Sequence, residues 1–156
     1  MAVEIERKFL VEGDAWRDSV TASRRIRQAY LSNGGAASVR IRVIDEEKSV
    51  LTVKSKGKSG EAALSRAEFE YSVPLEDAVA MLDLRTGRII DKMRHLVPAG
   101  NGRTWEVDVF AGAHEGLVLA EIELEAADEP VEIPSWIGRE VTGDPRYGNV
   151  ALAQEG

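Results

Sequence analysis

The sequence predicts an α+β fold, in which a closed eight-stranded antiparallel β-barrel forms a tunnel and a few helices flank it. Apolar and polar residues alternate with a period of two in eight successive segments, as in strands with one buried face. Turn residues such as Asn33-Gly34-Gly35 and Asn101-Gly102 separate some of these segments. Closing about eight strands into a barrel removes the exposed edges that an open sheet carries.

The predicted elements follow one another in a simple order. The strands are residues 3–11, 24–32, 38–44, 48–56, 66–73, 88–97, 104–111 and 117–125. A short helix is expected over residues 14–19, because Asp14 is suited to its N-cap. A second helix is expected from Pro74 to about Leu84, where apolar residues recur at helical spacing.

A single domain over residues 1–156 is expected, because no linker, repeat or low-complexity tract divides the sequence. A chain of this length buries roughly 68–70% of its unfolded surface, which is enough for a core. Residues 57–64 read as a loop without a motif. The tail at residues 133–156 is expected to hold short helical pieces around Trp136 and from Asn149 onward.

The composition limits the classes of function. The net charge is −7, and an acidic chain is a poor partner for nucleic acid or an anionic membrane, so neither is expected. The chain has no cysteine, which excludes disulfides, zinc–thiolate sites and thiol nucleophiles. No secretory signal is recognised, and no apolar run approaches the ~20 residues that span a bilayer, so a cytoplasmic location is expected.

Charges of like sign recur two residues apart within the predicted strands, so each pair shares one face. The acidic pairs are Glu4/Glu6, Glu68/Glu70, Glu106/Asp108 and Glu121/Glu123, and the basic residues are Arg40/Arg42, Lys54 and Lys92/Arg94. For any one strand, a solvated outer face is the simplest interpretation. A surface that serves only solubility intersperses the signs, however, and this pattern segregates them.

Charged faces that point into a barrel must pair, bind metal or bind a charged ligand, because unpaired buried charges are costly. Carboxylates from neighbouring strands make oxygen-rich sites that suit Mg²⁺ or Mn²⁺. Arginine and lysine suit phosphate groups. The sequence therefore predicts a cavity for a metal–polyphosphate complex.

The N-terminal run Glu4-Ile5-Glu6-Arg7-Lys8 resembles the signature of the triphosphate tunnel metalloenzymes, also called the CYTH superfamily. The rest of the chain follows the order of that family, through Gln28, Tyr30, the charged positions above and the ending Glu140-Val141-Thr142-Gly143-Asp144 with Arg146, Tyr147 and Asn149. The ending looks like that of the short bacterial inorganic triphosphatase-like members. The resemblance implies an eight-stranded tunnel and hydrolysis of inorganic triphosphate to pyrophosphate and phosphate, with Mg²⁺ or Mn²⁺, two per site.

The resemblance also implies roles for particular residues. The positions that match metal ligands are Glu4, Glu6, Glu121 and Glu123. The positions that match substrate-binding cations are Lys8, Arg40, Arg42, Lys54, Lys92 and Arg94. Lys8 and Glu6 are the expected catalytic residues, with Lys8 stabilising charge at the reacting phosphate. The remaining acidic positions ligate a second metal, position water or neutralise the basic array: Glu68, Glu70, Glu106 and Asp108.

Other functions remain open from the sequence. Within the family, these are a nucleoside or thiamine triphosphatase and a class IV adenylate cyclase, although no base-binding element stands out. Outside enzymes, the alternative is a non-catalytic polyphosphate- or nucleotide-binding module, which needs no complete acidic set. A homodimer is compatible with a small barrel of this kind, but no residue specifies one.

Overall fold

A computed structural model describes residues 2–55 and 65–154, except for the side chains of residues 2–4, 65, 149, 150 and 154. The predicted loop at residues 57–64 and the end of the predicted strand 48–56 lie outside the described residues. None of the described helices is long and apolar enough to cross a membrane.

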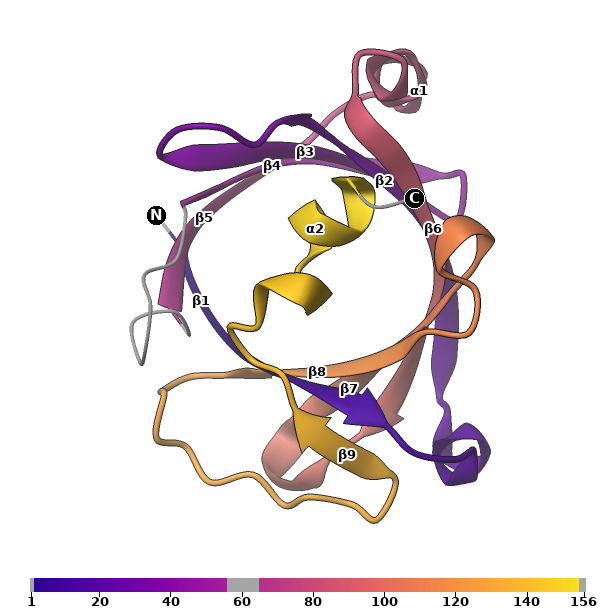
Figure 1. The fold of residues 1–156 in the computed structure, drawn as a ribbon, viewed down its shortest axis with the longest axis vertical. Coiled ribbons are helices and arrows are strands. Elements are labelled where there is room, and N and C mark those ends of the chain that lie inside the picture. The colour runs from indigo at the N-terminus through magenta and orange to yellow at the C-terminus, as the bar shows by residue number, and fades with distance from the viewer. Residues whose placement is uncertain (1, 56–64, 155–156) are drawn as a thin grey trace.

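The strands of the described chain form one antiparallel sheet that curves around a central space (Figure 1). They are β1 (Ala2–Val11), β2 (Ala22–Ser32), β3 (Ala37–Ile44), β4 (Lys48–Ser55), β5 (Ser65–Ser72), β6 (Thr86–Pro98), β7 (Thr104–Phe110), β8 (Val118–Leu124) and β9 (Ile137–Glu140). Their order is β5-β4-β3-β2-β6-β7-β8-β1-β9, and β1 also pairs with β5. The predicted antiparallel, tunnel-like architecture is confirmed, with nine strands rather than eight.

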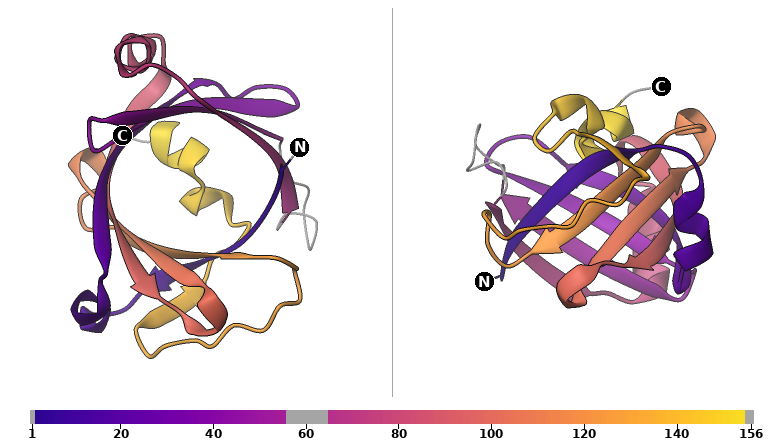
Figure 2. Two further views of the ribbon diagram at one scale, coloured as in Figure 1. Left: turned by 180° about the vertical axis from the view of Figure 1, so that it is seen from behind. Right: turned by 90° about the horizontal axis from the view of Figure 1, so that it is seen from below.

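The helices occupy two different places. The 3-10 helix η1 (Ala15–Ser19) and the helix α1 (Leu75–Leu82) lie outside the ring of strands, close to the predicted positions (Figure 1). The helix α2 (Asn149–Gln154) follows the short 3-10 helix η5 (Pro145–Tyr147) and lies across one end of the tunnel (Figure 2). Two further single-turn 3-10 helices, η3 (Gly100–Gly102) and η4 (Gly112–His114), lie in loops.

The outer faces of the strands carry most of the apolar core, as the alternation predicts. One cluster lies under η1, β9 and the segment before β9: Phe9, Trp16, Val97, Trp105, Val107, Ala120, Ile122, Leu124, Trp136 and Ile137. A second cluster lies under α1: Ala29, Ile41, Val43, Ala78 and Leu82. Because the apolar residues face outward, the charged residues between them face the tunnel.

One end of the tunnel interior is apolar, which the sequence analysis did not predict. Leu152 of α2 packs there against Tyr30, Ile90, Phe110 and Leu119, all from the inner faces of strands. Phe110 and Leu119 therefore interrupt the charged inner faces of β7 and β8. This cluster fixes the C-terminal segment across the tunnel opening.

One local prediction is wrong, and another is confirmed only for the position of the residue. The segment after Trp136 forms the strand β9 rather than a helix, because the edge of β1 beyond its pairing with β5 has free backbone groups that β9 satisfies. Trp136 itself joins the outer core, with its ring 5.7 Å from that of Trp105 in an edge-to-face arrangement. Asp14 is the N-cap residue of η1, as predicted, but its side chain makes no capping hydrogen bond; its carboxylate accepts a hydrogen bond from Arg17 instead.

Candidate functional site

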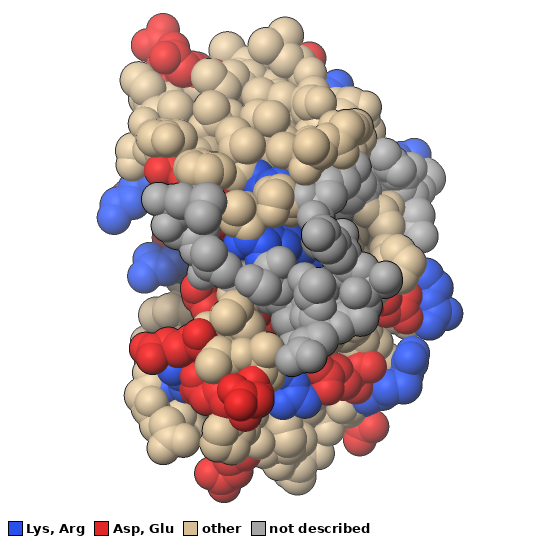
Figure 3. Space-filling view, turned by 90° about the vertical axis from the view of Figure 1, so that its left-hand side faces the viewer, with Lys and Arg blue, Asp and Glu red and all other residues tan. Residues whose placement is uncertain are grey.

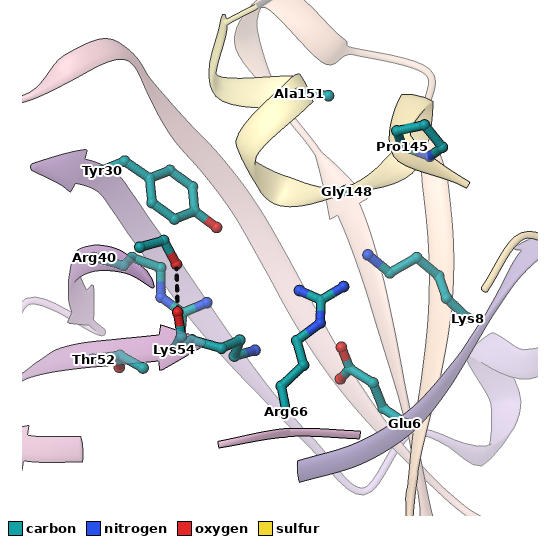
Figure 4. Close-up of a pocket in the computed structure, with 11 residues that line it drawn as sticks. Glu6, Lys8, Tyr30, Arg40, Thr52, Lys54, Arg66, Pro145, Gly148 and Ala151 are labelled. Carbon is teal, nitrogen blue, oxygen red and sulfur yellow. Dashed lines mark hydrogen bonds between the residues drawn. The ribbon is translucent and has the colours of Figure 1, made fainter. Parts of the chain in front are cut away.

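A cavity of about 310 Å³ opens inside the tunnel beside the C-terminal segment. Most of its polar lining comes from β1, β3, β4 and β5, whose side chains point inward at every second residue. The lining residues are Glu6, Lys8, Tyr30, Ser38, Arg40, Thr52, Lys54, Arg66, Pro145, Gly148 and Ala151 (Figure 4). On the side where β1 and β5 meet, Lys and Arg atoms are visible near the middle of the surface (Figure 3).

Arg40 and Thr52 form a buried polar pair on one wall of the cavity. They are Cα partners in the β3–β4 register, so their side chains share one face. Arg40 is 7% exposed and Thr52 is 2% exposed, yet Arg40 Nε and Thr52 Oγ1 have no hydrogen-bond partner among the described residues. Buried polar atoms normally have partners, so this wall is suited to a polar ligand.

Lys8 lies on the opposite wall and links β1 to the C-terminal segment. Its Nζ donates a hydrogen bond to the carbonyl oxygen of Tyr147 over 3.0 Å. The same Nζ lies 3.5 Å from Glu121 Oε1 of β8. Lys54 on β4 is held in a comparable way, with Nζ 3.4 Å from Glu68 Oε2 of β5. Both ammonium groups are therefore fixed at the cavity wall by a carboxylate.

The deeper part of the tunnel holds a buried ion cluster on β6 and β7. Lys92 is 1% exposed, and its Nζ lies 2.7 Å from Asp108 Oδ2. Arg94 binds the same carboxylate through two hydrogen bonds of 2.8 and 2.9 Å. Arg94 also donates to Glu106 over 3.2 Å. The register explains the cluster, because Arg94 and Asp108 are Cα partners across the two strands.

Burial and neighbouring charges shift the pKa values of the residues in and around this cluster. Burial lowers the pKa of Lys92 to about 7, although the neighbouring Asp108 opposes the shift. Burial raises the pKa of Asp108, but Lys92 and Arg94 outweigh that effect and hold it below its ordinary value. The pKa of Glu121 is likewise held well below its ordinary value, because Lys8, Arg94 and Lys92 outweigh the effect of burial. The carboxylates are thus ionised at neutral pH, while Lys92 titrates near it.

Arg42 and Gln28 extend the polar wall beyond Arg40. Arg42 Nε donates to Gln28 Oε1 over 2.7 Å, and the two residues are Cα partners between β2 and β3. Burial lowers the pKa of Arg42, and the nearby Arg40 and Arg94 lower it further. Gln28 is fully buried, and its Nε2 has no partner among the described residues. These adjacent cations are the kind of array that a polyanion stabilises.

The predicted metal ligands are only partly assembled by the described residues. The Cα atoms of Glu6 and Glu123 are partners between β1 and β8, and a hydrogen bond from Glu6 contributes to the low pKa of Glu121. Glu123 is exposed at the end of this face. The side chain of Glu4 lies outside the described residues. Within the described chain, no three acidic or histidine side chains lie close enough together to hold a metal ion.

The remaining predicted acidic positions fall into two groups. Glu68, Glu106 and Asp108 each lie within 4.0 Å of a basic side chain in the tunnel. Glu70 is exposed, and its Cα partner across the β4–β5 register is Thr52. Three of these carboxylates therefore form ion pairs with Lys or Arg.

Residues 2–150 match the CYTH domain. The chain belongs to the CYTH family. A curated relative from Acetivibrio thermocellus, named inorganic triphosphatase, is 43% identical over 155 residues, which is 99% of this chain and 95% of the relative. A second relative of that name, from Nitrosomonas europaea, is 35% identical over 153 residues, which is 96% of each chain.

A solved structure supports the same family at the level of the fold. The crystal structure of an inorganic triphosphatase matches this CYTH chain with a TM-score of 0.70 and 31% sequence identity. The match covers 100% of this chain and 97% of the other. The resemblance that the sequence motifs indicated is therefore confirmed.

Three features of the CYTH tunnel here were not predicted as parts of the site. Thr52 and Arg66 line the cavity, and the alternation already placed them on the charged faces of their strands. Neither residue was predicted as part of the site from the sequence. The carbonyl oxygen of Tyr147 contacts Lys8, and no sequence signal marks a backbone group of that kind.

Proposed function

We propose that this CYTH chain hydrolyses inorganic triphosphate to pyrophosphate and phosphate in a reaction that needs a divalent metal ion. The observation that carries the proposal is the cavity wall formed by Arg40 and Thr52. Arg40 Nε and Thr52 Oγ1 have no hydrogen-bond partner among the described residues, and this wall borders a chamber rich in cations. The names of the two relatives support the choice of substrate. We take the pairing of β1 with β5 as support for a closed barrel around that substrate.

The basic residues bind and orient the substrate in this proposal. Arg40 and Arg42 each present a guanidinium group, which pairs with phosphate oxygens in a bidentate manner. Lys54 lines the same cavity, and Lys92 and Arg94, which are buried outside its lining, balance further negative charge in our proposal. Such fixed charges stabilise a transition state without reorganising, which is the main requirement of phosphoryl transfer.

The facing carboxylates fit a hard divalent cation. Glu6 and Glu121 lie close together and are rich in oxygen, as Mg²⁺ and Mn²⁺ prefer. We propose Glu4 and Glu123 as further ligands, and two metal ions in each site. When bound there, the metal supplies positive charge to the phosphate oxygens of the substrate.

The other charged residues have supporting tasks. Lys8 holds a positive charge at the reacting phosphate, and Glu121 fixes its ammonium group. Glu106 and Asp108 orient Arg94 and Lys92, and Glu68 orients Lys54. Glu70 has no such partner in our proposal and is assigned to a second metal ion or to positioning water. The proposal requires neither nucleic acid nor a membrane, and it holds for a monomer or a homodimer.

Phosphate release from four substrates tests this proposal. Inorganic triphosphate, ATP, thiamine triphosphate and pyrophosphate are each incubated with Mg²⁺, Mn²⁺ or EDTA, with Lys8→Ala as the inactive control. We expect metal-dependent turnover of inorganic triphosphate that exceeds turnover of ATP and is lost in the control. Cyclic AMP formation from ATP would instead indicate a cyclase. Tight binding of triphosphate without release would indicate a binding module.

A further inference from the structure

Arg66 is a cation of the cavity that the proposed mechanism has not used. It is the second residue of β5, and its Cα partner in β1 is Glu4. Its side chain extends into the cavity between Lys54 and Lys8 (Figure 4). Glu6 lies beside it, but Lys8, Lys54 and Arg40 line the same cavity, so an anionic ligand reduces the repulsion among these cations.

The pairing of Arg66 differs from that of the other cations nearby. Lys54 has Glu68 as an ion-pair partner, and Lys8 has Glu121. Within the described part of the chain, Arg66 makes no hydrogen bond or ion pair. Among the described residues, nothing accepts a hydrogen bond from this guanidinium, so its donors are available to a ligand there.

The depth of Arg66 differs from that of the cations on the other wall. Arg40 and Lys92 are buried, whereas Arg66 is partly exposed and lies at the start of its strand. A linear polyphosphate that contacts both walls places one end near the buried cations and the other end near Arg66. The phosphate at that outer end is free in an inorganic chain and esterified in a nucleotide, so it distinguishes the two kinds of substrate.

We propose that Arg66 determines specificity by binding the terminal phosphate at the outer end of the substrate. This inference rests on the proposed function of the same cavity. A free terminal phosphate has three non-bridging oxygens and a second ionisable proton, which suit the forked guanidinium. An esterified phosphate at that position, as in a nucleotide, has one oxygen fewer and one negative charge fewer. Arg66 therefore favours inorganic triphosphate over nucleoside triphosphates.

Kinetics of the full chain test this role with Arg66→Ala, Arg66→Lys and a matched control. Arg25→Ala is the control, because it removes one positive charge from the outer surface, where Arg25 pairs with Asp91. For Arg66→Ala, we expect kcat/KM for inorganic triphosphate to fall about 10- to 100-fold and that for ATP by less than about threefold. Arg66→Lys recovers part of the loss, and Arg25→Ala leaves both values unchanged. The melting temperature of Arg66→Ala is expected to match that of the wild type.

Binding measurements separate this inference from the proposed function. Calorimetry with inorganic triphosphate and with ATP, both in EDTA, reports binding by the cations without turnover. If the wild type binds triphosphate but hydrolyses nothing, the proposed function fails, and a selective loss of triphosphate binding in Arg66→Ala still supports the role of Arg66. Equal losses for both ligands, no loss for either, or a wild type that binds neither would overturn it.

Discussion

Lys92 and Asp108 form a buried ion pair across β6 and β7, with 2.7 Å between Nζ and Oδ2. Both side chains are almost completely excluded from solvent, and Arg94 shares the same carboxylate. Arg94 also pairs with Glu106, so two carboxylates balance the two cations in this part of the tunnel. This arrangement holds the two basic side chains in place.

Replacing Asp108 by Asn is expected to destabilise the fold, because it leaves Lys92 and Arg94 without their shared counter-charge. Breaking a buried ion pair by removing one partner typically costs about 3–5 kcal/mol. Urea unfolding at neutral pH measures the loss. Asp128→Asn is the control, because Asp128 is exposed, and it is expected to change stability very little. Equal stability of the two variants would contradict the structural role of Asp108.

The pH dependence of kcat/KM is expected to depend on Lys92. Burial lowers its pKa to about 7, so in the free enzyme the ammonium charge is present below that pH and is lost above it. Because the substrate is an anion, kcat/KM falls as pH rises through about 7. For kcat, the decline is expected at higher pH, because phosphate bound nearby favours the charged form of Lys92. Lys92→Arg is expected to remove the decline in kcat/KM, and a decline that survives in this variant belongs to another group.

Glu140 is expected to stabilise the C-terminal segment only at pH values above the pKa of its carboxylate in the folded state. Arg7 donates two hydrogen bonds to its carboxylate and lowers the pKa of Glu140, with a smaller contribution from Thr142. A lowered pKa means that the stabilisation is present above about pH 4.5 and disappears as pH falls through the folded-state pKa. Because Glu140 is 37% exposed, Glu140→Gln is expected to cost only about 0.5–1 kcal/mol at neutral pH.

Thermal or urea unfolding at several pH values checks this difference. Glu47→Gln is the control, because Glu47 is exposed in a turn. The stability gap between Glu140→Gln and the wild type is expected to narrow as pH falls below about 4.5. A gap that stays constant over that range would assign the effect to packing or geometry rather than to charge.

Leu152 is expected to anchor the end of the tunnel. It is 3% exposed and packs with Ile90, Phe110 and Leu119 inside the strands. Leu152→Ala should therefore lower the unfolding free energy by about 2–5 kcal/mol, which is the usual range for such a cavity. Leu84 is 71% exposed, so Leu84→Ala is expected to have little effect. If both variants unfold like the wild type, the C-terminal helix does not depend on this contact.

The alternation of residues predicted much of the wall of the tunnel. Arg40 and Arg42 face inward and Ile41 faces the core, because a two-residue period fixes the side of each residue once strands form. The family match confirms the resemblance that the N-terminal motif indicated. The roles of the individual site residues stay predictions, because their geometry alone does not test them.

Other features depend on contacts that no local pattern records. The apolar end of the interior, with Phe110 and Leu119, exists because the C-terminal helix packs there from a distant part of the sequence. The strand after Trp136 forms because β1 has an available edge, not because of its own composition. The contact between Lys8 and the Tyr147 carbonyl involves a backbone atom, which side-chain patterns do not mark.

The most direct test of the central claim is the initial rate of phosphate release from inorganic triphosphate as Mg²⁺ is titrated, for the wild type and for Glu6→Ala. Glu6 lines the cavity, and its carboxylate lies next to Glu121. The wild type should show no release in EDTA and a rate that rises and saturates with Mg²⁺, while Glu6→Ala loses at least about 100-fold of that rate, roughly 2.7 kcal/mol of transition-state stabilisation. A Glu6→Ala protein that keeps the full metal-dependent rate would contradict the proposed metal site, and a wild type without release would contradict the function.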